Sequence, residues 1–556
     1  MASEFELDRR RFLGSGLALA AGGVAACSSL QGERRFDTVL RGGSVLDGSG
    51  AAAFEADIAV RGERIAAIGS FDAASAARVI DARGLCVAPG FVDIHTHSDR
   101  TIFEWPGADS RVRQGCTTEV TGNCGSSAAP RDPRALDEDD QGRAPTWTDV
   151  RSYAAAWEAN DAALNHALLV GHGSLRRSVM GDVDRAATED ELALMVRRLE
   201  LALEQGAIGL SSGLEYVPGI YTPAAELERL ARSVAAKGGL YASHMRSEEE
   251  HLLDAVRETI DIGRKTGVRV QVSHLKAAGR PNWGSQDAAL ELLENARAEG
   301  LDVLADAYPY TAYSTTLTIL LEAWSREGGA EEIAKRLADP AARARMLREV
   351  GPHVQRDPGG FELVVISSVA SPALQECLGK SLAQIAELWS VEPAEAYLRL
   401  LEGARAEVSY VGHGMSAENV ERVLAHPLVM IGSDGRSMAP TGSAADDRPH
   451  PRSYGTFPRV LGHYCRERKL FDLPTAVRKM TSMPAERARL SDRGRIAPGA
   501  FADLVVFDAA TVTDVATFDD PQRYPRGILH VLVNGQPVVE RGAPTGARPG
   551  RWLASV

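Results

Sequence analysis

The sequence predicts an α/β protein in which a (β/α)8 (TIM) barrel interrupts a small β domain, and three observations lead to this fold class. Short apolar runs alternate with long amphipathic stretches between about residues 89 and 485, as expected of repeated strand–helix units. Strand-like segments flank this region on both sides. The chain has 556 residues and exceeds one ordinary domain, so a barrel with a second, smaller domain fits its length.

The first 30 residues resemble an export signal. They combine a basic cluster with a short apolar stretch that ends at Cys27 and is too short and too glycine-rich to span a bilayer. The run RRRFL at 9–13 resembles a twin-arginine signal, and VAAC at 24–27 resembles a lipobox, in which the cysteine is lipidated. We expect an exported lipoprotein, periplasmic or at the cell surface, that meets the membrane only through a lipid on Cys27. The alternatives are a signal peptide with an incidental cysteine and a frayed N-terminal helix.

The segments 31–88 and 486–556 are expected to form the small β domain together. Alternating apolar and polar residues between 36 and 88 are bounded by Gly and Asp, a pattern typical of a small antiparallel unit. Strand-like segments return after about residue 485, in GRIAPGAFADLVVFD and HVLVNGQPVV. A barrel spanning residues 89–485 and inserted into one β domain explains both ends of the chain.

Eight apolar runs supply the expected barrel strands. They lie at 86–94, 116–121, 166–171, 207–211, 239–243, 268–273, 301–306 and 428–433. The clearest amphipathic helices are 190–205, 223–237, 248–265 and 285–299. The segment between about 310 and 425 is too long for one loop, so we expect an inserted subdomain over the barrel mouth. The runs ELVVISS and EVSYVGHG within it leave the strand count open.

Composition and charge exclude several classes of protein. The chain is 44% hydrophobic and 25% charged, as in globular domains. Its formal net charge is −13 and its basic residues are not clustered, so we expect no nucleic-acid partner. Six cysteines in a chain of this length are too sparse for a disulfide scaffold.

Residues that can bind a metal follow five of the eight apolar runs, at the end where barrel enzymes place their chemistry. They are His95 and His97 after the first run, Cys124 after the second, His244 after the fifth, His274 after the sixth and Asp434 after the eighth. The first two lie two residues apart on an extended strand and therefore share one face.

Each of these residues alone has an ordinary structural explanation. The histidines could be hydrogen-bonded core residues, Cys124 could be an inert thiol or form a disulfide with Cys116, and Asp434 could cap a helix. Five strands that each deliver a ligand-type residue at the same end make coincidence improbable. One cysteine and two histidines suit tetrahedral Zn²⁺ with water in the fourth position, which is typical of a catalytic site.

Several long motifs occur in order between about residues 36 and 550. They are PGFVDIHTH, TGNCG, GLSSGLEYVPG, SHLKAAG, DAYPYTAYSTTL, SDG and HPRSYGTFPRVL. On these motifs the chain resembles the N-acyl-D-amino-acid deacylase family of metal-dependent amidohydrolases. The resemblance implies a β-sandwich beside the barrel and hydrolysis of the amide bond of N-acyl-D-amino acids to a carboxylate and a free D-amino acid.

The resemblance also implies the roles of the site residues. It places a tightly held zinc on Cys124, His244 and His274, a weaker second site at His95 and His97, and a proton shuttle at Asp434. The fourth strand, at 207–212, offers no lysine or glutamate to bridge two metals, so we do not expect a stable binuclear centre.

The remaining candidates concern the substrate. Two residues suit the binding of a substrate carboxylate. Arg452 has a guanidinium that can form two parallel hydrogen bonds, and Lys276 lies two residues beyond His274. By resemblance Tyr308 and Ser314 join them, and Tyr216 contacts the scissile carbonyl. His95 is a further candidate for orienting the aspartate or the carbonyl. The alternative for these residues is an ordinary surface or core position.

Two other functions remain open from the sequence. One is a related amidohydrolase that cuts dipeptides with a C-terminal D-residue or cyclic amides, and the other is an inactive lipoprotein that binds metal or a partner. The stretch 314–321 contains no arginine that could pair with an acidic side chain, which favours neutral or apolar D-amino acids. We assign no role to His172 and His413, and the sequence carries no information on oligomeric state.

Overall fold

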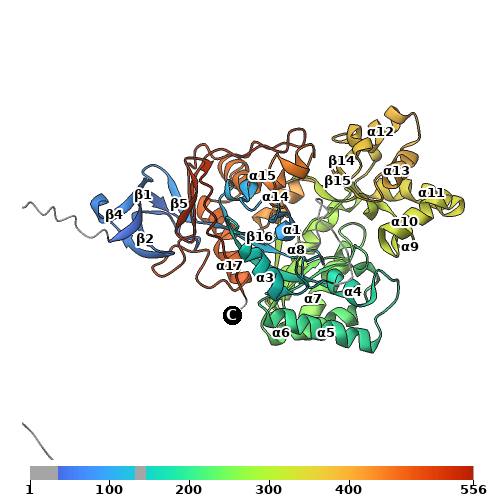
Figure 1. Ribbon diagram of the computed structural model, residues 1–556, viewed down its shortest axis with the longest axis horizontal. Coiled ribbons are helices and arrows are strands. Elements are labelled where there is room, and N and C mark those ends of the chain that lie inside the picture. The colour runs from blue at the N-terminus through green and yellow to red at the C-terminus, as the bar shows by residue number, and fades with distance from the viewer. Residues whose placement is uncertain (1–34, 132–145, 555–556) are drawn as a thin grey trace, which may run out of the picture.

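The computed structural model describes residues 35–131 and 146–554 (Figure 1). The expected export signal and Cys27 lie outside these residues. In the part of the chain that is described, none of the helices combines the length and the apolar character needed to cross a bilayer.

Eight parallel strands form the barrel, and the predicted fold class is confirmed. The strands are β6 (Phe91–Asp93), β7 (Cys116–Thr121), β8 (Asn165–Gly171), β9 (Gly209–Gly213), β10 (Leu240–His244), β11 (Arg269–Val272), β12 (Val303–Ala307) and β16 (Val429–Ile431). They are hydrogen-bonded in this order, and a parallel bridge between Thr96 and Gly435, just beyond β6 and β16, joins the first strand to the last. Their carboxyl ends therefore meet at one mouth.

The first predicted run, 86–94, is two strands rather than one. Cys86–Pro89 is β5, which belongs to the sheet of the small β domain, and the barrel strand β6 begins only at Phe91. Gly90 lies between them against Thr117, where a side chain would clash. An apolar run predicts that both segments are buried. It does not show that they enter different sheets, because the β domain and the barrel both bury their strands in an apolar interior.

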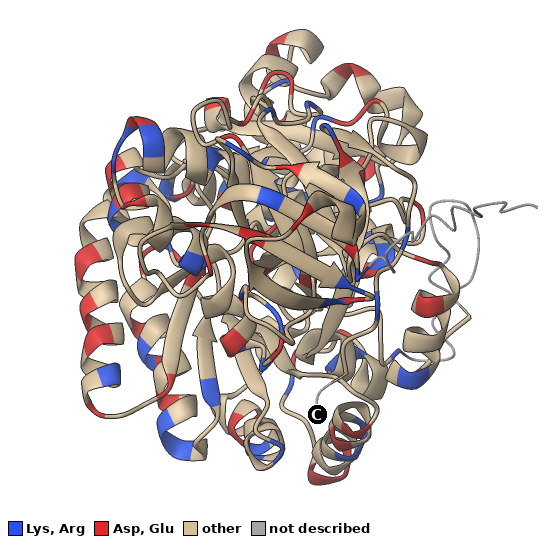
Figure 2. Ribbon diagram, turned by 90° about the vertical axis from the view of Figure 1, so that its left-hand side faces the viewer, with Lys and Arg blue, Asp and Glu red and all other residues tan. Residues whose placement is uncertain are grey.

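Four long helices cover one side of the barrel, close to the predicted ranges. They are α5 (Glu189–Glu204), α6 (Ala224–Ala236), α7 (Leu252–Thr266) and α8 (Gln286–Ala298). α5 begins with a capping box between Thr188 and Glu191, and α7 ends where Gly267 adopts a φ of 73°. Figure 2 shows acidic and basic residues interspersed over the face that it presents.

Shorter helices complete the shell of the barrel. They are α1 (Ser98–Thr101), α2 (Asp109–Val112), α3 (Val150–Ala159), α4 (His172–Met180), α14 (Ala417–Ala425), α15 (Arg452–Arg459), α16 (Leu473–Met480) and α17 (Ser482–Arg487). α15 begins at Arg452, so the start of this helix brings one of the predicted substrate residues to the barrel mouth.

The small β domain is built from both ends of the described chain and lies at the left of Figure 1. Its strands are β1 (Phe36–Val45), β2 (Phe54–Arg61), β3 (Arg64–Gly69), β4 (Ala76–Asp81), β5, β17 (Leu504–Phe507), β18 (Ile528–Val533), β19 (Gln536–Glu540) and β20 (Ala543–Pro544). β5 pairs in parallel with β1 and antiparallel with β17, so it joins the N-terminal strands to the C-terminal ones.

A subdomain with its own apolar core follows β12 and lies at the right of Figure 1. Its sheet consists of β13 (Tyr313–Thr316), β14 (Val364–Val369) and β15 (Val408–Gly412), and its helices are α9 (Ala323–Arg326), α10 (Gly329–Ala338), α11 (Pro340–Arg356), α12 (Leu382–Trp389) and α13 (Pro393–Gly403). The two runs that left the strand count open are β14 and β15. The subdomain places β13 beside the barrel mouth.

Candidate active site

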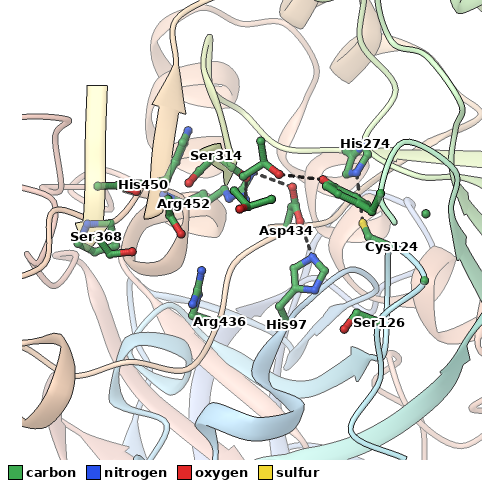
Figure 3. Close-up of a pocket in the computed structure, with 18 of the residues that line it drawn as sticks. His97, Cys124, Ser126, His274, Ser314, Ser368, Asp434, Arg436, His450 and Arg452 are labelled. Carbon is green, nitrogen blue, oxygen red and sulfur yellow. Dashed lines mark hydrogen bonds and ion pairs between the residues drawn. The ribbon is translucent and has the colours of Figure 1, made fainter. Parts of the chain in front are cut away.

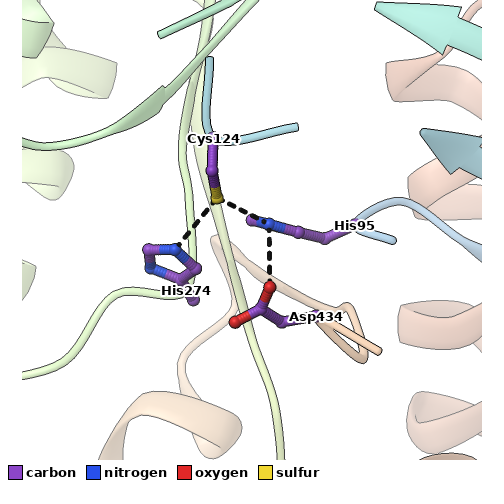
Figure 4. Close-up of side chains that lie close together, drawn as sticks. All are labelled: His95, Cys124, His274 and Asp434. Carbon is purple, nitrogen blue, oxygen red and sulfur yellow. Dashed lines mark hydrogen bonds and ion pairs between the residues drawn. The ribbon is translucent and has the colours of Figure 1, made fainter. Parts of the chain in front are cut away.

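The metal-type residues predicted from the sequence lie together at the carboxyl ends of the barrel strands. Figure 4 shows His95, Cys124, His274 and Asp434 pointing toward one another. His244, the last residue of β10, lies beside His274, and His97 lies beside Asp434. All are buried except His97, whose side chain is 31% exposed. The six residues form one cluster.

Distances within the cluster fit a metal ion. Cys124 Sγ lies 3.3 Å from His95 Nε2 and 3.4 Å from His274 Nε2, and the latter atom lies 2.9 Å from His244 Nδ1. A tetrahedral zinc ion, with bonds of about 2.0 Å to nitrogen and about 2.3 Å to sulfur, holds its ligand atoms roughly 3.3 to 3.6 Å apart. The donor set therefore fits zinc.

The cluster contains two overlapping groups of donors. In one, ligand atoms of His95, Cys124, His274 and Asp434 all lie within 4.8 Å of one another, and in the other His244 and Glu248 meet the same His274. The residues expected at the tight and at the weak metal site therefore lie side by side. Cys116 and Cys124 are both free thiols, which excludes the disulfide alternative.

The charges around Cys124 favour its thiolate form. Burial alone would raise the pKa of this thiol, but His95 and His274 beside it bring the pKa well below its ordinary value. A thiolate is the form of cysteine that binds metals. The two neighbouring histidines thus stabilise the form of Cys124 that can bind a metal ion.

Three residues of the cluster adopt left-handed backbone conformations that side chains other than glycine rarely take. The φ angles are 51° at Cys124, 33° at His274 and 52° at Asp434. Such conformations cost of order 1–3 kcal/mol each and persist only where the surrounding structure imposes them. Each lies two or three residues after the end of a barrel strand, where a sharp turn of the chain aims the side chain into the mouth.

Three carboxylates that the sequence analysis did not single out hold the ligand histidines. Asp306 Oδ1 lies 3.0 Å from His95 Nδ1. Glu215 Oε2 lies 2.8 Å from His244 Nε2, and Glu248 Oε1 lies 2.8 Å from His274 Nδ1. Carboxylates on the free nitrogen fix the orientation of metal-bound imidazoles. Asp306 ends the seventh apolar run and could have been found by the rule that found the others, whereas the two glutamates lie in loops without such a signal.

The main cavity at this mouth has a volume of about 370 Å³. Cys124, His274 and Asp434 line it, together with the predicted substrate residues Tyr216, Ser314 and Arg452 (Figure 3). Part of its wall comes from the inserted subdomain, since Thr315, Ser368 and Ser409 belong to β13, β14 and β15.

Arg452 and Asp434 form an ion pair in this cavity. Arg452 Nη1 lies 2.7 Å from Asp434 Oδ2, as a charge contact rather than an aligned hydrogen bond, and Arg452 Nη2 donates to the Ser314 carbonyl at 3.0 Å. Burial would raise the pKa of Asp434, but Arg452 and His95 hold it well below its usual range. The aspartate is therefore ionised.

The other two predicted substrate residues lie behind this cavity. Lys276 and Tyr308 line a smaller neighbouring cavity and not the main one. Lys276 forms an ion pair with Glu248, and its ammonium lies 5.7 Å from the centre of the Tyr308 ring. Lys276 is thus already neutralised by a carboxylate, which its sequence position did not reveal.

The two histidines without an assigned role have structural partners elsewhere. His172 lies 2.9 Å from Glu226, which also binds Arg176. His413 packs against Phe518 with 4.8 Å between ring centres. Neither lines the main cavity.

Comparison with known proteins shows that this chain is similar to one protein family, to two curated relatives and to one solved structure described below. The model of the amidohydrolase family matches residues 78–539. A D-aminoacylase from Alcaligenes xylosoxydans xylosoxydans is 42% identical over 526 residues, which cover 93% of this chain and 98% of the relative. An N-acyl-D-glutamate deacylase from the same organism is 41% identical over 526 residues. This alignment covers 94% of this chain and 97% of the relative.

One solved structure extends the likeness to three dimensions. It is an N-acyl-D-glutamate deacylase from Bordetella bronchiseptica, complexed with zinc and with a phosphonate inhibitor that mimics the tetrahedral intermediate. It matches this chain with a TM-score of 0.80 at 39% identity and covers 94% of this chain and 100% of that chain.

Proposed function

The chain belongs to the amidohydrolase family, and we propose that it hydrolyses the amide bond of N-acyl-D-amino acids with the help of zinc, releasing a carboxylate and a free D-amino acid. The observation that carries this proposal is the buried cluster of one thiolate, histidines and an ionised aspartate at the mouth of a cavity of about 370 Å³. Its relatives are named for deacylation of D-amino acids.

We assign the tightly held zinc to Cys124, His244 and His274, and a weaker second site to His95 and His97. When bound, zinc supplies a Lewis acid for the amide carbonyl and lowers the pKa of water to near 7. The carboxylates of Asp306, Glu215 and Glu248 keep the imidazoles in place. Their support matters because the ligand histidines come from separate strands.

Asp434 is assigned the proton transfer. Its carboxylate takes a proton from the attacking water and delivers it to the leaving nitrogen, as a general base and then a general acid. His97 Nε2, 2.8 Å from Oδ1, and His95 Nε2, 3.4 Å from the same atom, position the carboxylate. Arg452 supports its ionised form from the other side.

We assign the substrate carboxylate to Arg452, Lys276, Tyr308 and Ser314. The guanidinium of Arg452 lies 5.1 Å and the ammonium of Lys276 5.7 Å from the centre of the Tyr308 ring, so both cations lie near this one residue. Each now has a protein carboxylate as partner, and a bound substrate would share these cations with Asp434 and Glu248. Tyr216, whose hydroxyl lies 3.0 Å from Thr315 Oγ1, is assigned to the scissile carbonyl.

The proposal is tested with zinc-loaded protein and matched N-acetyl-D- and N-acetyl-L-amino acids. We expect kcat/KM to favour the D-enantiomers by at least about 100-fold, because the clamp and the proton shuttle fix the configuration at the α-carbon. Equal rates for the two enantiomers would contradict the assignment to N-acyl-D-amino acids.

We also propose that the chain is exported and lipidated at Cys27. The proposal comes from the motifs of the first 30 residues and is independent of the chemistry. Membrane fractionation of cells that express the full chain tests it. Cys27→Ala should move the protein out of the membrane fraction, whereas the control Cys465→Ala should not. Membrane retention of Cys27→Ala would exclude the anchor.

A further inference from the structure

A second, smaller cavity adjoins the reaction centre. Its volume is about 30 Å³, enough for one or two water-sized groups, since a single water needs roughly 10–15 Å³. It shares five lining residues with the main cavity: Tyr216, His274, Ser314, Thr315 and Asp434. Figure 3 shows three of these shared residues, Ser314, Asp434 and His274, in the main cavity.

The position of the cavity suits the amino-acid half of the substrate. Lys276 and Tyr308, two of the residues assigned to the substrate carboxylate, line the small cavity and not the main one, and Ser314 lines both. A substrate whose carboxylate is held there has its α-carbon at the junction. The end of its side chain can then enter the small cavity while its acyl group lies in the main one.

The small cavity is lined by more carboxyl groups than its cations neutralise. Glu248 pairs with Lys276 and His274, and Glu215 pairs with His244. Two further carboxyl groups, those of Glu249 and Asp357, also line it.

Asp357 is the more deeply buried of these two groups, with 6% of its surface exposed. Its Oδ2 atom accepts a hydrogen bond from the Tyr313 hydroxyl, while its Oδ1 atom is buried without a partner. Glu249 lies close enough to Glu215 for the two carboxyl groups to share a hydrogen bond. Among residues 35–131 and 146–554, neither Asp357 nor Glu249 forms an ion pair with a basic side chain. Buried carboxylates without a partner are costly.

The neighbouring carboxyl groups affect the protonation of Asp357. Burial raises the pKa of this carboxyl to about 7, helped by Glu215 and Glu248 and opposed by the Tyr313 hydrogen bond and by Lys276. A cation placed between Asp357 and Glu249 would favour the ionised form of both carboxyl groups.

Aromatic rings complete a lining that suits a cation. Tyr313 and Tyr410 both line the cavity, with 5.9 Å between their ring centres in an edge-to-face arrangement. Ring faces attract ammonium groups electrostatically, most strongly where water is excluded. An ammonium group also has about the size of a water molecule and fits the small volume, whereas the carboxylate of an acidic side chain would face the like charges of Asp357 and Glu249.

We propose that Asp357 and Glu249 form a side-chain subsite for an ammonium group, so that the preferred substrates are N-acyl derivatives of D-lysine and D-ornithine. This inference rests on the proposed function and adds the class of side chain to it. In the sequence, the lack of an arginine in 314–321 favoured neutral or apolar side chains, and the proposal departs from that expectation because of the carboxyl groups around the small cavity. Asp357 and Glu249 come from segments in which no sequence pattern indicated a site.

The test compares kcat/KM for Nα-acetyl-D-lysine, N-acetyl-D-norleucine and N-acetyl-D-glutamate with zinc-loaded protein. Norleucine has the carbon chain of lysine without the ammonium. We expect lysine to exceed norleucine by at least about 10-fold, with glutamate last, since a hydrogen bond to a charged group contributes a factor of about 10 to 100.

Variants separate the subsite from a merely structural role. Asp357→Asn should lower kcat/KM for the lysine substrate by about 10- to 100-fold and should change the norleucine value at least ten times less. Glu249→Gln should act in the same direction, and because this side chain is only partly buried, the substitution disturbs folding less than Asp357→Asn. Glu250→Gln, at the exposed neighbouring glutamate, is the matched control and should leave both values unchanged.

The outcomes distinguish the inference from the proposed function. Norleucine preferred over lysine, or equal losses on both substrates in Asp357→Asn and Glu249→Gln, would overturn the subsite and leave D-deacylation standing. Absence of hydrolysis of every D-substrate would overturn the proposed function and the subsite with it.

Discussion

Asp434 lies between the two kinds of residue that the proposed reaction needs. Its Oδ1 atom is 2.8 Å from His97 Nε2, in the metal cluster, and its Oδ2 atom is 2.7 Å from Arg452 Nη1, in the substrate clamp. Arg452 and His95 outweigh the effect of burial and hold the pKa of Asp434 well below its usual range. The carboxylate is therefore ionised before substrate binds and can accept a proton.

Asp434→Asn is expected to retain zinc and to lose turnover by at least about 100-fold. An amide keeps the size of the side chain but cannot take the proton, and removal of a general acid or base has an effect of this order. Metal content and kcat measured on the same preparation check the prediction. Retained zinc shows that the site is intact, and unchanged turnover would remove Asp434 from the mechanism.

Single residues also show the limit of sequence reasoning at this scale. The type of each ligand residue and its place after an apolar run could be read from the sequence, because both are local properties. The ion pair of Lys276 with Glu248 could not. The two residues are 28 positions apart in the chain. Nothing in the sequence pattern indicates that the loop between β10 and α7, which carries Glu248, lies beside Lys276.

At the scale of elements, the turn after β7 depends on the end of β9. A Cβ atom built on Gly213, the last residue of β9, would clash with the Cys124 carbonyl oxygen, and one on Gly125 would clash with the Gly213 backbone. Gly125 also has a φ of 73°. The two glycines let the turn that carries Cys124 lie directly against its neighbouring strand.

Gly213→Ala is expected to lower zinc affinity by about 10-fold or more. The added methyl group must displace the Cys124 backbone, and displaced support of a ligand typically costs this much affinity. Competition with a chelator measures the change. Gly284→Ala is the matched control, because a Cβ there meets nothing within 4 Å. Equal zinc affinity in the two variants would show that Cys124 tolerates the shift.

At the scale of the whole molecule, a buried polar network joins the β domain to the barrel. Asp503, just before β17, forms an ion pair with Arg493, and both side chains are almost fully buried. Its Oδ1 atom accepts from the Asn534 backbone at 2.7 Å, and Asn165, the first residue of β8, donates to its Oδ2 atom at 3.4 Å. One buried carboxylate thus links the two units.

Asp503→Ala is expected to lower the free energy of unfolding by about 3–5 kcal/mol, because it leaves the Arg493 guanidinium buried without its partner. The kcat of the remaining folded protein should be unchanged, since Asp503 does not line either active-site cavity. Denaturant unfolding checks the first expectation. Asp492→Ala is the control: its ion pair with Arg64 is largely exposed and should contribute at most about 1 kcal/mol. Equal losses in the two variants would contradict the role of the network.

The fold class and the chemistry of the cluster follow from local patterns in the sequence. Strand and helix periods, and the ligand-type residues that end the strands, are set by neighbouring residues, so eight strand segments and six site residues could be predicted. Tertiary structure decided what depends on distant segments. The pairing of His95 with Asp306 across 211 positions, the entry of β5 and β6 into different sheets, and the acidic cavity around Asp357 are examples. A sequence pattern records burial and period, but the partners of a buried charge are chosen by packing.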